Sequence, residues 1–182
     1  MRPAGIVDQS IEAFHGTLKP RAEEVLLNQA IKPSENSYDW LGHGVYFWEG
    51  SANHAIQWAV KHHGRDACVL RATVYLGRCL DLMDTKYVPL LLTARDELEE
   101  NLRLRGATFP VNQQGRNDLD CAVIEWILKH HLEADTVRGA FTEGNRLFPG
   151  SMFQDLTHIQ VAVRNPLSIR GPIEKVYEVR SP

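Results

Sequence analysis

The sequence predicts an α+β fold: mixed, largely antiparallel strands that form a sheet, with flanking helices and a helical insertion. Residues 68–76 (CVLRATVYL) alternate along the chain and are rich in β-branched side chains, which is typical of a strand. Residues 19–31 instead place apolar side chains at helical spacing. Two late strand-like runs, 135–141 and 158–163, follow a helical middle part of the chain. Strands and helices are therefore both expected in one domain.

The first third of the chain predicts the order strand, helix, strand, helix. Residues 11–17 (IEAFHGT) form a short strand that ends beside a glycine, and the helix of residues 19–31 follows it. A loop rich in proline, serine and asparagine begins at Pro33. Residues 42–50 (GHGVYFWEG) give a short β-like run between glycines, and residues 51–61 (SANHAIQWAVK) return to helical spacing.

The second part of the chain begins with the strand of residues 68–76, which continues past Gly77. Residues 87–105 and 121–131 then predict helices, so that roughly residues 80–132 form the helical insertion. The charged run in the first of these helices is interpreted as a solvated face. A loop containing glycine and proline separates the two late strands.

The bulk properties limit the possible classes of function. A chain of 182 residues is expected to form one domain, residues 1–182. Its net charge of −3 gives no overall attraction to phosphate backbones, so a nucleic acid would have to bind through a local patch. Cys68, Cys79 and Cys121 are odd in number and widely spaced, which favours a reducing cytoplasm over a disulfide framework or a zinc site. No segment approaches the roughly 18 apolar residues of a membrane span.

Three short segments carry residues suited to chemistry. Each contains glycine, histidine, tyrosine or a polar side chain at the end or on the face of a predicted strand. These segments are His15-Gly16-Thr17, the run Gly42–Phe47 followed by Ser51-Ala52-Asn53, and the late strand that carries Gln160.

Together these segments resemble the diphtheria-toxin-type ADP-ribosyltransferases, which include the poly-ADP-ribose polymerases. In that family an early strand ends in His-Gly-Ser or His-Gly-Thr. A second segment reads glycine, any residue, glycine, aliphatic, Tyr, Phe and is followed by Ser-Ala-Asn. A last strand carries a third residue, usually Glu, where this chain has Gln160. The resemblance covers roughly half the chain, leaves residues 80–132 unassigned, and implies an ADP-ribosyltransferase-like split sheet, with NAD as the substrate and no metal.

The resemblance implies a nicotinamide pocket around His15 and Tyr46. Nicotinamide in NAD is a flat cation, and the face of Tyr46 is suited to stack on it. Gly16 lets the backbone approach the nicotinamide carboxamide, and Ser51 is expected to hold that group from the other side. His15 is expected to donate a hydrogen bond to a ribose hydroxyl. Taken singly, such residues are more often structural, but their order along the chain favours the pocket.

Four further residues complete the predicted pocket. Gly42 and Gly44 permit the turn that presents Tyr46. Thr17 completes the first motif. His54 stands where the family has a second stacking tyrosine just after Ser-Ala-Asn, so it is placed in the pocket, with a ring that is flat but less electron-rich.

Gln160 is the main departure from the family. Cleavage of the glycosidic bond passes through an oxocarbenium-like ribose, and a side-chain acceptor on a ribose hydroxyl stabilises it. The amide oxygen of Gln160 can accept that bond, but an amide is not a general base. Glu143 and Asp155, in the loop before the strand, are candidate acids in its place, and Glu143 is preferred because it follows a strand end beside a glycine. Alternatively, Gln160 is a plain polar residue of a half-buried strand.

Other conspicuous side chains have structural interpretations. The adjacent pairs His62–His63 and His130–His131 would point in different directions on a helix, unlike a zinc pair four residues apart. Trp48, two residues after Tyr46, alternates to the same face and is a candidate for the cleft wall. Arg138 and Arg164 flank the late strands, where they would either meet a pyrophosphate or aid solubility.

Three functions stay open at this point. The first is a cytoplasmic, bacterial-type mono-ADP-ribosyltransferase that transfers ADP-ribose from NAD to a protein or nucleic-acid acceptor. The resemblance allows a toxin or phage-defence role, with an antitoxin or inhibitor protein as a further partner and no membrane. The second is an NAD glycohydrolase, in which water replaces the acceptor. The third is a catalytically inactive module that binds NAD or ADP-ribose, which Gln160 in place of Glu favours.

Overall fold

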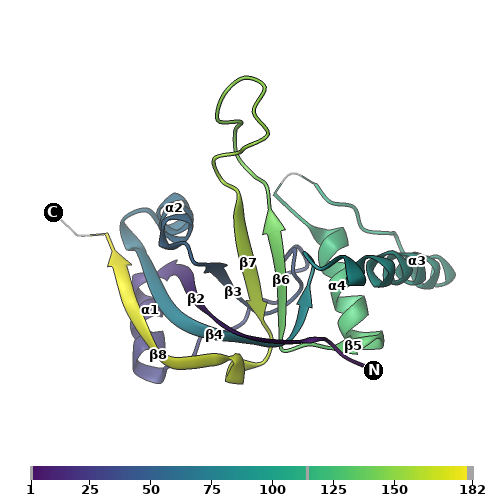
Figure 1. The fold of residues 1–182 in the computed structure, drawn as a ribbon, viewed down its shortest axis with the longest axis horizontal. Helices are drawn as coiled ribbons and strands as arrows, with labels where there is room; N and C mark the ends of the chain where they lie inside the picture. The colour runs from purple at the N-terminus through teal and green to yellow at the C-terminus, as the bar shows by residue number, and fades with distance from the viewer. Residues whose placement is uncertain (1, 114, 180–182) are drawn as a thin grey trace.

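A computed structural model describes residues 2–113 and 115–179 (Figure 1). Its longer elements include five strands that exchange hydrogen bonds in a ring, four helices and one additional strand. In chain order the elements are β1 (Arg2–Pro3), β2 (Ile6–Leu18), α1 (Lys19–Asn28), β3 (Val45–Glu49), α2 (Ala52–His63), β4 (Ala67–Asp81), α3 (Val88–Leu104), α4 (Asp118–His130), β5 (Leu132–Glu133), β6 (Thr136–Phe141), β7 (His158–Val163) and β8 (Ile169–Glu178). Short 3-10 turns lie at Gly64–Asp66, Thr85–Tyr87 and Pro166–Ser168.

The main sheet closes on itself. Strand β2 pairs with β3 and β4, β3 with β7, β7 with β6, and β6 with β4, which completes a five-stranded ring. Strand β8 lies along another stretch of β4. Among the pairings of the described residues in this sheet, β4–β6 is parallel and the others are antiparallel. The predicted α+β class with mixed, largely antiparallel strands is confirmed; the closure of the ring was not predicted, because pairing between distant strands leaves no local signal.

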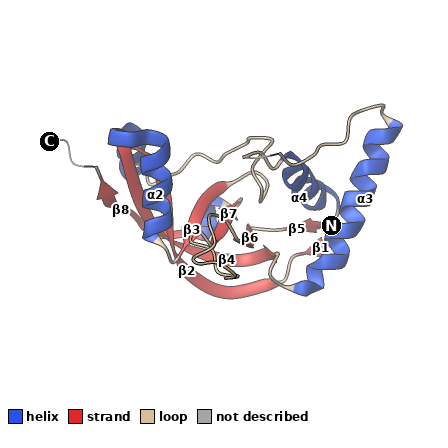
Figure 2. Ribbon diagram, turned by 90° about the horizontal axis from the view of Figure 1, so that it is seen from above, coloured by secondary structure: helices blue, strands red, loops and turns tan. Residues whose placement is uncertain are grey.

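The two faces of the ring are covered by different helices. One face buries Ala13, Phe47, Leu70 and Val161 and is completed by α1. The opposite face is divided: α2 covers its β2–β3 side, whereas α3 and α4 cover its β4–β6 side. Figure 2 shows α2 at one end of the curved sheet and α3 with α4 at the other. Because successive side chains of a strand point to opposite faces, each strand contributes apolar residues to both layers.

Several element boundaries differ from the prediction. Strand β2 starts at Ile6, five residues early, and α1 ends at Asn28 because Gln29 takes a left-handed conformation (φ 54°). The helical insertion contains α3 and α4 as expected. Strand β8 was missed, so the strand carrying Gln160 is not the last; Gly171 and Pro172 interrupt its pattern, and an edge strand tolerates both. Within the described residues, no helix combines the length and apolarity needed to cross a bilayer.

Candidate functional site

The sheet opens between β2 and β3. These strands pair at two positions, Ala13 with Glu49 and Phe14 with Trp48. Beyond that point β2 continues to pair with β4 as far as Leu18, while β3 pairs with β7 as far as Val45. The two strands therefore part immediately before the His-Gly-Thr motif of β2 and beside the Tyr46 segment of β3.

Backbone groups from both strands face this opening. The Gly50 N–H donates to the Glu12 carbonyl at 2.9 Å, so Glu12 directs its backbone groups toward β3. Backbone direction alternates along a strand, and β2 is regular from Ser10 onward, so Gly16 also points its N–H and C=O toward β3. The same alternation directs the Tyr46 carbonyl toward β2. A donor and an acceptor of Gly16 thus stand at the opening.

His15 bridges the opening. Its Nδ1 lies 2.8 Å from the Tyr46 carbonyl oxygen. A carbonyl only accepts, so Nδ1 carries the proton, and the neutral ring has its lone pair on Nε2. Burial lowers the pKa of His15, which favours the neutral ring, and Arg21 and His63 act in the same direction. The sequence predicts a donor role for His15 toward ribose; in the structure its Nδ1 proton is already bound to the Tyr46 carbonyl, and the neutral ring offers an acceptor at Nε2.

Gly16 is required by helix packing. A Cβ at this position would lie 2.9 Å from the Ala55 carbonyl oxygen and 3.1 Å from Trp58 Cε3, both on α2. The glycine therefore lets α2 pack against β2, which is a different reason from the close ligand approach that was predicted. Its backbone edge still faces the opening. Thr17, the next residue, is buried.

Tyr46 holds the loop that precedes its own strand. Its hydroxyl donates to the Gly42 carbonyl (2.8 Å) and accepts from the Leu41 N–H (2.9 Å). The ring is partly exposed and packs against the apolar layer of α3 and α4, and burial raises the pKa of the hydroxyl. Gly42 and Gly44 take positive φ angles of 74° and 156°, as expected for a turn that needs glycine.

Ser51 and His54 lie at the start of α2. Ser51 is the N-cap residue: its hydroxyl accepts from the His54 N–H at 3.5 Å and lies 2.7 Å from His54 Nδ1. The His54 ring is 5.2 Å from the His158 ring. Partial burial and then His158 lower the pKa of His54. The structure thus brings the His54 ring beside the strand that carries Gln160. The Ser51 hydroxyl, however, is already bonded to His54 at the start of α2.

Gln160 is buried and bonded at both ends of its amide. It stands opposite Trp48 in the β3–β7 ladder. Trp40 Nε1 donates to its Oε1 at 3.2 Å, and its Nε2 lies 3.0 Å from His158 Nε2. His158 Nδ1 in turn lies 2.6 Å from the Leu156 carbonyl, which requires the proton on Nδ1 and leaves Nε2 as an acceptor for Gln160. The chain of hydrogen bonds is self-consistent and contains no carboxylate.

Glu143 and Asp155 lie in the β6–β7 loop, which projects from the body of the protein (Figure 1). Both side chains are exposed. Asp155 Oδ1 accepts from the Asn145 N–H at 2.8 Å, so this carboxylate caps the loop. Glu143, preferred from the sequence as the replacement acid because it follows a strand end beside a glycine, is exposed to solvent. Large apolar side chains are also exposed here: Leu147, Phe148, Met152 and Phe153.

Arg138 is engaged within the sheet. Its guanidinium donates to both Glu49 oxygens (2.6 and 2.7 Å) and to Asp81 (2.9 Å), and all three side chains are about 15% exposed. This cluster joins β3, β4 and β6, and neither predicted role of Arg138 anticipated it. Arg138 is 89 positions from Glu49 and 57 positions from Asp81 in the sequence, so no local pattern indicates these contacts. Trp48 is buried against α2, 5.6 Å from the Trp58 ring, and so belongs to the core.

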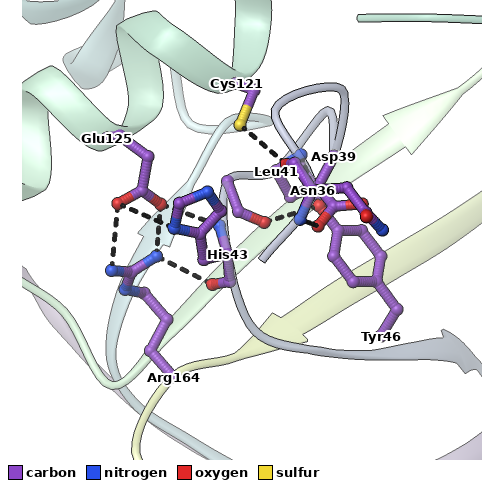
Figure 3. A network of polar contacts seen from close by, with 9 residues as sticks. Asn36, Asp39, Leu41, His43, Tyr46, Cys121, Glu125 and Arg164 are labelled. Atoms are coloured by element: carbon purple, nitrogen blue, oxygen red, sulfur yellow. Dashed lines mark hydrogen bonds and ion pairs between the residues drawn. The ribbon is translucent and has the colours of Figure 1, made fainter. Parts of the chain in front are cut away.

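A second ion pair connects the insertion to the Tyr46 loop (Figure 3). Glu125 on α4 accepts from the His43 N–H (2.7 Å) and from Arg164 (2.5 and 3.2 Å). Arg164 also donates to the His43 carbonyl at 2.7 Å. The pair lines a hollow of about 370 Å³ on the surface of α4, with Ala122, Trp126, Leu128 and Lys129. Arg164 was predicted at a pyrophosphate or as a solubility residue; its partner is instead a carboxylate.

The histidine pairs have structural contacts. The His62 ring stacks on Trp58 at 4.4 Å, and His131 Nε2 lies 2.5 Å from Glu97. Among the residues that the structure describes, no group of three histidine, cysteine or acidic side chains is arranged to hold a metal ion.

Comparisons with known proteins give little beyond the geometry. No protein-family model matches the chain, and no solved structure matches it. A stretch of 45 residues, 25% of the chain, is 40% identical to an uncharacterized protein of Methanocaldococcus jannaschii. This stretch spans 21% of that protein's length. The likeness concerns a short segment, so the resemblance to ADP-ribosyltransferases stays a prediction.

Proposed function

We propose that this protein binds NAD at the opening between β2 and β3 and transfers its ADP-ribose to a macromolecular acceptor, a protein or a nucleic acid. The observation that carries the proposal is the parting of the two strands after Phe14 and Trp48. It places the backbone N–H and C=O of Gly16 opposite Tyr46, in the sequence context that resembles the ADP-ribosyltransferases.

The groups at the opening match the chemistry of nicotinamide. A carboxamide presents one acceptor and two donors, and the N–H and C=O of Gly16 are the complementary pair. The ring of Tyr46, with His54 as the second aromatic wall, would flank the pyridinium cation. Nε2 of neutral His15 accepts a hydrogen bond from a ribose hydroxyl. These contacts orient the bond between nicotinamide and ribose for cleavage.

The bond cleavage has to proceed without a base at position 160. When the glycosidic bond breaks, its electron pair leaves with nicotinamide and the ribose carbon becomes cationic. Gln160 offers no carboxylate, and its amide already bonds Trp40 and His158. The acceptor must therefore bring a nucleophile that reacts without deprotonation by Gln160.

A second candidate function follows from the same residue. The buried and internally bonded amide of Gln160 favours a module that binds NAD or ADP-ribose without cleaving it. In that case the opening is the whole site, and the strand with Gln160 only supports it.

One experiment separates these functions. The purified protein is incubated with NAD labelled in the adenosine half, with and without cell extract, and binding is measured by calorimetry. Label on protein or nucleic acid supports transfer, free ADP-ribose alone indicates a glycohydrolase, and binding without turnover indicates the inactive module. Absence of both binding and turnover refutes the proposal.

A tyrosine comparison tests the pocket itself. Tyr46→Ala is expected to weaken NAD binding by about 10-fold or more, because it removes the aromatic face. Tyr38→Ala is the matched control, since Tyr38 is exposed in the same loop and contacts Arg116. Equal NAD affinity in the two variants would show that the pocket has been misplaced.

A further inference from the structure

The helical insertion meets the proposed site through one ion pair. Glu125 projects from α4, and Arg164 follows directly after β7. Figure 3 shows both side chains converging on the backbone of His43. Glu125 accepts from the His43 N–H, Arg164 donates to the His43 carbonyl, and the two side chains bond each other. Both polar groups of one loop residue are therefore held by the pair.

The loop that the pair holds is the loop that anchors Tyr46. His43 stands between Gly42 and Gly44, both of which have positive φ. The Gly42 carbonyl and the Leu41 N–H bind the Tyr46 hydroxyl. The chain of contacts therefore runs from α4 through His43 and Gly42 to Tyr46.

The loop also fits tightly against α4. A Cβ on Gly42 would lie 2.5 Å from Glu125 Oε1 and 2.8 Å from Ile124 Cγ2. Gly42 is thus needed for its backbone angle and for the approach of Glu125. The side chains of Glu125 and Arg164 are only 28% and 25% exposed, so solvent weakens the pair less than it would weaken a fully exposed one.

We propose that Glu125 and Arg164 are positioning residues for NAD, and that the helical insertion serves as a brace that sets the Tyr46 loop. The proposal rests on the proposed function for its ligand, while the brace itself is independent of it. Neither side chain touches the opening; both act through the backbone of His43.

Amide hydrogen exchange and NAD calorimetry test this together. In Glu125→Ala, exchange at Leu41 and Gly44 is expected to accelerate about 10-fold, although Glu125 contacts neither amide. NAD affinity should fall by a similar factor. Glu125→Gln keeps an acceptor for the His43 N–H but loses the charge that faces Arg164, so it should restore part of both losses.

The control is Glu100→Ala on α3, which removes an ion pair with Arg103 that does not reach the loop. It should change neither measurement. Circular dichroism shows whether each variant is folded, and Glu125→Gln keeps the test usable if Glu125→Ala unfolds. Unchanged exchange at Leu41 overturns the brace. Faster exchange with unchanged NAD affinity overturns the positioning role. If the unaltered protein does not bind NAD, the proposed function fails, while the exchange data still decide the brace.

Discussion

The opening between β2 and β3 differs sharply from the Gln160 side of the same face. At the opening, backbone groups of Gly16 point toward a place where strand pairing has stopped. On the other side, Trp40, Gln160 and His158 satisfy one another in a closed chain. At the opening, strand pairing leaves the backbone groups of Gly16 without a β3 partner, whereas the polar groups around Gln160 are bonded to one another. The contrast supports binding at the opening more strongly than it supports chemistry at Gln160.

The largest expected effect is at the opening. Gly16→Val places side-chain atoms against the Ala55 carbonyl and Trp58, so it should displace α2, lower the free energy of unfolding by about 3 kcal/mol and abolish NAD binding. Gly50→Ala is the control, because among the described residues no heavy atom beyond its chain neighbours lies within 4 Å of its Cβ position; its positive φ costs about 1 kcal/mol. Thermal denaturation and calorimetry measure both variants. A Gly16→Val protein as stable as Gly50→Ala contradicts the packing argument.

The next effect concerns Gln160. Gln160→Glu supplies the carboxylate that the resemblance places there, so turnover of NAD should rise by about 100-fold while NAD affinity stays similar. The exposed change Gln113→Glu adds the same charge elsewhere and should leave turnover unaltered. Release of labelled nicotinamide measures the rate. A folded Gln160→Glu protein that gains no activity would favour the inactive module.

A third change separates stability from binding. Trp40→Phe leaves the buried Gln160 oxygen without its indole donor and should cost about 2 kcal/mol of unfolding free energy, with NAD affinity unchanged. Trp126→Phe removes an exposed indole bond to Glu97 and should cost about 0.5 kcal/mol. Urea denaturation gives the two values. A parallel fall in NAD affinity for Trp40→Phe would mean that the two regions are one site.

The smallest effect is a pH dependence from His15. Its pKa in the folded protein lies below the ordinary value of 6.5, first because of burial, so the unfolded chain binds the proton more tightly. The stability contribution is therefore complete above about pH 6.5 and is lost as pH falls through the folded pKa. NAD affinity should fall in the same direction, because the protonated ring has no acceptor at Nε2. His15→Gln should flatten the binding curve, whereas His62→Gln should keep it.

The sequence predicted what local patterns encode. Alternation and glycines identified the strands of His15 and Tyr46, and helical spacing identified both helices of the insertion. Contacts between distant residues had no such signal: Trp40 bonds Gln160 from 120 positions away, and Arg138 on β6 bonds Glu49 on β3 from 89 positions away. Gly16 is a third case. From the sequence, a glycine was expected there for close approach of a ligand, whereas the structure requires it for the packing of α2 against β2. Local rules predict where the chain turns, whereas tertiary packing decides what each turn is for.

The short β2–β3 pairing has a mechanical consequence. In a closed ring of strands, the pair of strands with the fewest backbone hydrogen bonds is expected to separate first. Two residue pairs make the β2–β3 pairing, while β2 and β4 are paired over most of their length. The amides of the β2–β3 pairing should therefore open at a lower free energy than those of the rest of the ring. If the proposed function holds, local opening of the β2–β3 pairing would be enough to admit NAD, without unfolding of the other strand pairs.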